Sequence, residues 1–184
     1  MGRFRNYFFN WLIKKRTTFG WIFFIIIAIF GKGNLRNIIF GLPFIIVGEF
    51  FRFLSSGIIK KNEILTKEGL YSLCRNPLYF GSFLVSFGFA ISSCSLFVWA
   101  YFIIFFPLIY IPTIKNEEIF LENKFGEEFK KYKKEVPSFF PVFKKVNIFK
   151  GFSLKKFKEN QEIINIFGIL TLIGILLVKS YYEL

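Results

Sequence analysis

The chain alternates between long apolar segments and short stretches rich in lysine and arginine. Two of the five segments reach the roughly 17–25 residues that a membrane-spanning helix needs, and the other three need flanking residues or a tilt. The pattern predicts an all-α, multi-pass helical membrane bundle with about five transmembrane helices. The apolar segments are Phe19–Phe30, Ile38–Ile59, Leu78–Ile91, Leu96–Ile114 and Ile163–Val178.

The third and fourth segments together are too long for one helix across one bilayer. The polar cluster Ser92–Ser95 lies between them and is the natural place for the chain to turn. We therefore expect an antiparallel helical hairpin with both ends on the same membrane face. This arrangement brings the acidic pair Glu117 and Glu118 back to the face where Arg75–Gly81 begins.

The sequence that contains and follows this acidic pair predicts a cytoplasmic amphipathic segment over residues 115–160. Its apolar residues recur at helical spacing, and Gly126 is expected to separate two short helices. Val136 and Pro137 end the second helix, because a residue before proline disfavours helical backbone. The apolar stripe comprises Leu121, Phe125, Phe129 and Tyr132.

Composition supports the membrane assignment and adds an orientation. The 184 residues are 54% hydrophobic, and 25 basic against 12 acidic residues give a net charge of +13. The basic residues flank the apolar segments, which favours the positive-inside pattern over nucleic-acid binding. With five spans, the N-terminus is expected in the cytoplasm and the C-terminus outside. Residues 1–16 read as an interfacial segment rather than a signal peptide. The richness in Phe, Ile, Lys and Asn points to a prokaryotic inner membrane.

Missing residue types exclude several kinds of chemistry. The chain has no His, and all of its acidic residues are Glu. A Ser-His-Asp or Cys-His mechanism and a His-liganded zinc site are therefore excluded, and no metal site is expected. Cys74 and Cys94 flank a predicted span and read as single thiols rather than a disulfide.

Charged residues within or beside spans are the candidates for function. Glu49 and Arg52 lie three residues apart, so they pair on one helix face, either as a structural ion pair or as a functional cation site. Arg52 alternatively extends toward the lipid headgroups. Because adjacent helical residues point about 100° apart, only one of Glu117 and Glu118 is expected to face packed residues.

Ordered motifs between Val47 and Pro141 resemble the isoprenylcysteine carboxyl methyltransferase and phospholipid methyltransferase superfamily of integral membrane enzymes. The resemblance implies a catalytic core over residues 47–141 within a single membrane domain, 1–184, with an extra C-terminal transmembrane helix at 163–178. The motifs are Gly48–Arg52, Leu65–Tyr71, Arg75–Gly81, Asn116–Glu118, Phe125–Phe129, Tyr132, and Val136-Pro137 followed by Pro141.

The resemblance implies methyl transfer from S-adenosylmethionine to a lipophilic acceptor at the cytoplasmic membrane face. The acceptor is an isoprenylcysteine-like carboxylate or a phospholipid headgroup. Arg52 and Lys115 are the substrate-binding candidates, and Arg52 and Glu117 the catalytic ones. By position, the cofactor-binding residues are Leu65, Thr66, Tyr71, Asn76, Pro77, Leu78, Tyr79 and Glu117, with Glu118 in reserve.

The chain departs from the superfamily pattern at two positions. Asn76 stands where His is usual, and it keeps a donor and an acceptor but loses the possibility of a positive charge. Thr113 stands where the isoprenylcysteine enzymes carry an arginine. Two alternatives therefore remain: an NADPH-dependent reductase of the sterol reductase type, and a non-catalytic membrane scaffold. Ser82, where the reductases commonly have an acidic residue, favours the methyltransferase.

Overall fold

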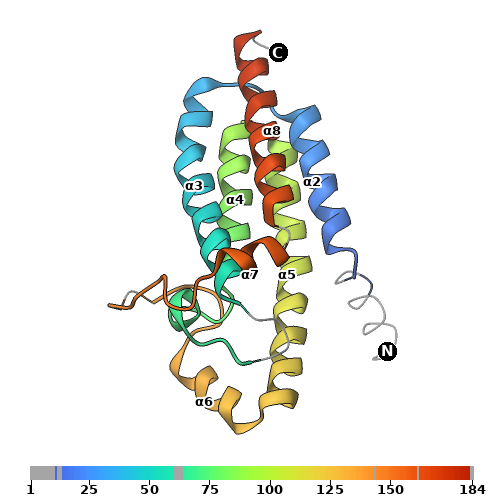
Figure 1. Ribbon diagram of the computed structural model, residues 1–184. Helices are drawn as coiled ribbons and strands as arrows, with labels where there is room; N and C mark the ends of the chain where they lie inside the picture. Colours follow the sequence, from blue (N-terminus) through green and yellow to red (C-terminus); the bar gives the residue numbers. More distant parts are fainter. Residues whose placement is uncertain (1–10, 12–13, 60–63, 143, 161, 183–184) are drawn as a thin grey trace, which may run out of the picture. The chain divides into compact units, whose positions relative to one another are not determined.

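In a computed structural model, every regular element in the described part of the chain is helical (Figure 1). The structure describes residues 11, 14–59, 64–142, 144–160 and 162–182. The predicted all-α class is therefore confirmed. The predicted interfacial segment at the N-terminus lies almost entirely outside the described residues.

Each predicted apolar segment forms a helix. Three helices are long and apolar enough to cross a membrane, namely α3 (Leu35–Ile58), α5 (Leu96–Phe125) and α8 (Glu162–Tyr181). The other two, α2 (Arg16–Phe30) and α4 (Pro77–Ser93), are apolar but have only 15 and 17 residues. At 1.5 Å per residue they extend about 22 and 26 Å, which is short of the roughly 30 Å of a bilayer core.

The expected hairpin is present, since α4 ends at Ser93 and α5 begins at Leu96. The α5 helix is longer than predicted, however, and continues without a break to Phe125. We expected two short helices around Gly126. The first of them was wrong, because the polar residues before Gly126 continue the long helix α5 instead of forming a helix of their own. Gly126 does end α5 with a positive φ of 52°, and α6 (Glu127–Glu135) follows it.

The described residues form two compact units. The first comprises residues 1–43, 86–117 and 171–184. Aromatic side chains fill it: the Tyr101 ring stacks on Phe23 and Phe105, and its hydroxyl donates to the Phe19 carbonyl. Near the end of α8, Lys179 donates to two carbonyls at the end of α2 and caps that helix.

The second unit comprises residues 44–85 and 118–170. Its cluster of Phe129, Tyr132 and Val136 packs against Leu65, Leu121 and Phe125, which confirms the predicted apolar stripe. The unit also contains a 3-10 helix, η1 (Gly69–Ser72), and a short helix, α7 (Leu154–Glu159).

In the second unit, α3 and α4 approach each other through two glycines. A Cβ added to Gly48 meets the Gly81 carbonyl oxygen at 2.7 Å, and a Cβ added to Gly81 meets the Gly48 oxygen at 2.6 Å. We expect Gly48→Ala to destabilise the protein by about 1–3 kcal/mol, because backbone atoms cannot move aside. Gly168→Ala on α8, where a Cβ meets nothing within 4 Å, is the control and should be neutral or stabilising. Equal thermal unfolding of the two variants contradicts this packing argument.

Candidate active site

The candidate site begins where the loop after η1 enters α4. Pro77 is the first residue of α4 and is fully buried. Proline suits this position, since it lacks an amide hydrogen that the first helical turn leaves unused. The preceding carbonyl, on Asn76, accepts the amide hydrogens of Tyr79 and Phe80, each at 3.1 Å. The Asn76 side chain is therefore held at the start of the helix.

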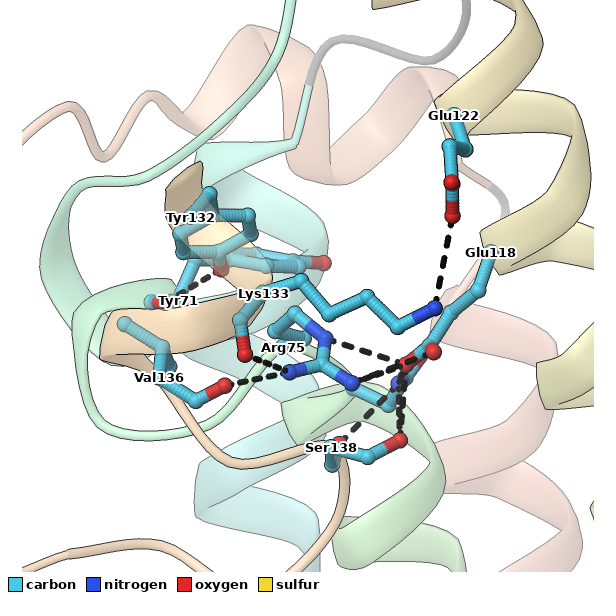
Figure 2. A network of polar contacts seen from close by, with 9 residues as sticks. Tyr71, Arg75, Glu118, Glu122, Tyr132, Lys133, Val136 and Ser138 are labelled. Carbon is cyan, nitrogen blue, oxygen red and sulfur yellow. Dashed lines mark hydrogen bonds and ion pairs between the residues drawn. The ribbon is translucent and has the colours of Figure 1, made fainter. Parts of the chain in front are cut away.

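The Glu118 carboxylate, on α5, is the centre of a polar network (Figure 2). Its Oε1 accepts hydrogen bonds from Arg75 Nη2 at 2.9 Å, Ser138 Oγ at 2.7 Å and Asn76 Nδ2 at 3.2 Å. Its Oε2 accepts one, from Arg75 Nη2 at 3.1 Å. Because the Arg75 and Glu118 side chains are only 8% and 13% exposed, the ion pair between them is mostly shielded from water.

The Arg75 side chain also holds the segment after α5. Figure 2 shows its guanidinium between Glu118 and two backbone carbonyls, those of Lys133 and Val136. Every guanidinium nitrogen is thereby used. The Arg75 amide donates to the Pro137 carbonyl at 2.8 Å, so backbone and side chain fasten the same segment. Arg75 is a clamp on α6, and its donors are already occupied.

Two of the predicted cofactor-binding side chains, Asn76 in this network and Thr66 outside it, keep unused hydrogen-bonding capacity. Nδ2 makes all of the described side-chain hydrogen bonds of Asn76, to Glu118 and Ser138, so Oδ1 still has acceptor capacity among the described residues. The Thr66 hydroxyl is buried without a partner among the described atoms. A buried hydroxyl without a partner is costly and marks a place for an additional polar group.

The acidic pair separates as expected, but the order of preference reverses. Glu118 lies in the network, whereas the Glu117 side chain is 48% exposed and pairs with Arg16 at 3.4 Å. The contacts therefore favour Glu118, the reserve residue, over Glu117. Sequence alone could not fix the helix rotation, since it depends on which face of α5 packs against Arg75.

The remaining cofactor-site candidates lie around this network. Tyr71 is buried, and its carbonyl accepts the Tyr132 hydroxyl. Burial raises the pKa of the Tyr132 phenol, which keeps it protonated as that donor. Leu65 packs against the Phe129 cluster, Tyr79 is buried, and Leu78 is half-buried.

The substrate candidates fall in different places. Arg52 contacts Glu49, as expected, with Nε 3.4 Å from Oε2, and it belongs to the second unit. Lys115 is exposed and belongs to the first. Thr113 is buried and donates its hydroxyl to the Ile109 carbonyl one turn earlier, so it supplies no cation.

The sequence pattern of the phospholipid methyltransferase family matches residues 35–128, about half of the chain. This chain belongs to the phospholipid methyltransferase family. The match includes Arg75, Asn76 and Glu118, ends in the first turn of α6, and leaves out Ser138 and α8. The superfamily predicted from the motifs is therefore confirmed.

Similar proteins carry two kinds of name. A cobalt-zinc-cadmium resistance protein, CzcN, from Cupriavidus metallidurans is 37% identical over 50% of this chain and 41% of its own length. Protein-S-isoprenylcysteine O-methyltransferases from Mus musculus and Schizosaccharomyces pombe are 35% and 28% identical, over 46% and 52% of this chain and 30% and 40% of their own lengths. This family member thus matches less than half of each relative. No solved structure matches it.

Two residues of this phospholipid methyltransferase family member were missed by sequence reasoning. Ser138 follows the helix-ending Val136-Pro137, and nothing in the sequence marked it as a partner of Glu118. Glu162 opens the last apolar segment as an isolated acid, and it contacts Arg52 with its Oε2 2.5 Å from Nη2. An isolated charge beside an apolar segment was the signal that could have found it.

Cys74 adjoins the network and is not suited to act as a nucleophile. Burial raises the pKa of its thiol to about 12, so the reactive thiolate is scarce at neutral pH. We expect a membrane-permeant maleimide to label the exposed Cys94 in the native protein and to leave Cys74 unmodified until denaturation. Cys94→Ser should abolish native labelling, as mass spectrometry can measure. Rapid native labelling of Cys74 in that variant contradicts the buried placement.

Proposed function

We propose that this protein transfers a methyl group from S-adenosylmethionine to a lipophilic acceptor within the membrane. The observation that carries the proposal is the network of Arg75, Asn76, Glu118 and Ser138, three of whose members lie in the matched family region. The acceptor classes follow from the family and from the relatives' names: a phospholipid headgroup or an isoprenylcysteine-like carboxylate.

The remaining hydrogen-bonding capacity of these side chains fits the proposed cofactor. S-adenosylmethionine supplies, when bound, an electrophilic methyl group on a sulfonium, and it offers hydroxyl, amino and carboxylate groups for recognition. Oε2 of Glu118 and Oδ1 of Asn76 are acceptors suited to hydroxyl or amino hydrogens. The buried Thr66 hydroxyl offers both a donor and an acceptor. Arg75 holds Glu118 in place rather than binding the cofactor itself.

In this proposal the protein's main contribution is alignment. A sulfonium methyl group is already reactive, so the rate depends mainly on holding the acceptor in line with it. The Arg75 clamp serves this purpose, because it fixes the Glu118 carboxylate against α6, and Asn76 donates a hydrogen bond to the same carboxylate. We place the site at the cytoplasmic face because Lys/Arg-rich stretches flank it, and we propose a prokaryotic inner membrane from the richness in Phe, Ile, Lys and Asn.

Ligand-dependent unfolding of the full chain in neutral detergent tests the cofactor. S-adenosylhomocysteine at 100 times its Kd is expected to stabilise the protein by about 2.7 kcal/mol, whereas NADPH should have no effect. Transfer of a radiolabelled methyl group into a lipid extract then tests the reaction. Stabilisation by NADPH alone favours a membrane reductase, and the absence of ligand binding and of labelled lipid favours a non-catalytic scaffold.

A further inference from the structure

The chain after α6 exposes apolar side chains among lysines. We call this segment the basic strip; it comprises residues 139–142 and 144–158 and belongs to the second unit. The sequence from 139 to 158 contains six lysines and no acidic residue. Phe140, Phe149 and Leu154 in it are 67%, 56% and 62% exposed. The strip lies beyond residues 35–128, so the family match does not account for it.

The basic strip is fastened to the last turns of α3. The Phe152 ring packs on Phe53 with the ring centroids 5.1 Å apart, in space that Gly57 leaves free by having no Cβ. The Ser153 amide donates to the Gly57 carbonyl at 2.9 Å. With 24 residues, α3 extends about 36 Å, enough to cross the roughly 30 Å of a bilayer core. Its last turns, and the strip attached to them, therefore lie at one edge of the membrane.

The basic strip also packs on the segment that leads into the candidate active site. The Val142 amide donates to the Leu73 carbonyl at 3.0 Å. Gly69, with a positive φ of 59°, lies so close to the strip that an added Cβ would meet the carbonyl oxygens of Ile148 and Lys150 at 2.9 and 3.0 Å. Because these contacts use backbone atoms, they hold the strip in place without its exposed rings and ammonium groups.

Most lysines of the basic strip are available for a partner. Two are occupied: Lys150 pairs with Glu68 at 2.9 Å, and Lys156 donates to two backbone carbonyls. Among the described residues, four exposed lysines of the strip make no ion pair, namely Lys144, Lys145, Lys155 and Lys158.

The combination of lysines with exposed rings points to a lipid surface. The positive-inside pattern explains lysines beside a span, but it does not explain apolar side chains exposed among them. The α6 helix has lysines without such side chains, because its Phe129 and Tyr132 are buried. At a membrane surface, apolar side chains enter the boundary between headgroups and acyl chains while ammonium groups meet lipid phosphates.

We propose that the basic strip binds anionic phospholipids, with Phe140, Phe149 and Leu154 inserted into the membrane surface beside the end of α3. The attachment to α3 favours a lipid over an acidic protein, because it places the strip at the membrane edge. The excess of lysines favours anionic over zwitterionic headgroups. The strip shares no residue with the Glu118 network, so its lipid binding is separate from the proposed function and is tested without an activity measurement.

The first test uses the full chain in neutral detergent, with short-chain phosphatidylglycerol, short-chain phosphatidylcholine and inorganic phosphate as probes. Phosphatidylglycerol is expected to raise the thermal unfolding midpoint, and the other two are not. The double variant Lys144→Gln/Lys145→Gln should weaken the apparent affinity for phosphatidylglycerol by about tenfold or more, because each lysine near an anionic surface contributes about fivefold. Lys131→Gln/Lys134→Gln is the matched control, since it removes two exposed lysines of α6. Its affinity should stay within about threefold.

The second test measures insertion in lipid nanodiscs with a bimane label on a Cys94→Ser background, where the remaining Cys74 is buried. A label on Leu154→Cys should be quenched by lipids that carry a doxyl group near the headgroup. A label on Lys131→Cys, on the polar face of α6, is the control and should not be quenched.

Equal stabilisation by the two phospholipids, or equal loss of phosphatidylglycerol affinity in the two lysine pairs, overturns the proposal. Stabilisation by inorganic phosphate to the same extent as by phosphatidylglycerol indicates an anion site without a lipid and also overturns it. If the label on Leu154→Cys is not quenched, the strip does not enter the membrane. A strip that responds to neither test favours an acidic protein as the partner, which contradicts lipid binding.

Discussion

Glu118→Gln is expected to lower methyl transfer by about 100-fold or more, whereas Glu117→Gln should leave it within about threefold. Glu118 accepts hydrogen bonds from Arg75, Asn76 and Ser138, so losing its charge disturbs every member of the network. It also leaves the Arg75 guanidinium buried without a counter-charge, which costs about 3–5 kcal/mol. Glu117 pairs with Arg16 at an exposed position, where an ion pair contributes about 0–1 kcal/mol.

The measurements are the initial rate of methyl transfer and the stabilisation by S-adenosylhomocysteine, both on purified full-length variants. Folding is checked first by the thermal unfolding midpoint, because Glu118→Gln loses a mostly buried ion pair. Glu117→Gln is a closely matched control, since it is the same substitution at the neighbouring residue of the same helix. A greater loss in Glu117→Gln than in Glu118→Gln contradicts the assignment made from the contacts.

Arg75→Lys is expected to release α6 and to destabilise the protein by about 1–3 kcal/mol for each buried carbonyl that loses its donor, although the positive charge is kept. A lysine ammonium cannot reproduce the planar fork that reaches Glu118 and the carbonyls of Lys133 and Val136 together. Hydrogen exchange of the α6 amides should therefore accelerate relative to those of α8, because the clamp is the main polar attachment described between α6 and the start of α4.

Lys133→Gln is the control for this experiment. It removes an exposed ion pair with Glu122 but keeps the backbone carbonyl that Arg75 binds. Exchange in α6 should stay within the range of the unmodified protein. If Arg75→Lys leaves hydrogen exchange of the α6 amides unchanged and alters exchange of the α8 amides instead, the prediction is contradicted. The packing of Phe129 and Tyr132 then holds α6 without the clamp.

Long, strongly apolar elements were predicted well from the sequence. Hydrophobicity over a dozen or more residues is a local property, so the five apolar helices and the turn at Ser92–Ser95 could be located directly. The boundary at Gly126 was also predicted, but the continuity of α5 from Leu96 to Phe125 was not, because the loss of hydrophobicity marks only the edge of an apolar stretch and not the end of a helix. The orientation of the N-terminus in the membrane stays a prediction from charge.

By itself, the sequence determined the helical membrane class, the hairpin, and the motif containing Asn76 and Pro77. These depend on composition, periodicity and order along the chain. Only the tertiary structure decided that Glu118 rather than Glu117 joins Asn76, that Arg75 is occupied as a clamp, and that Glu162 reaches Arg52. The physical reason is that side-chain partners depend on helix rotation and on contacts between residues as many as 110 positions apart. Neither leaves a local pattern in the sequence.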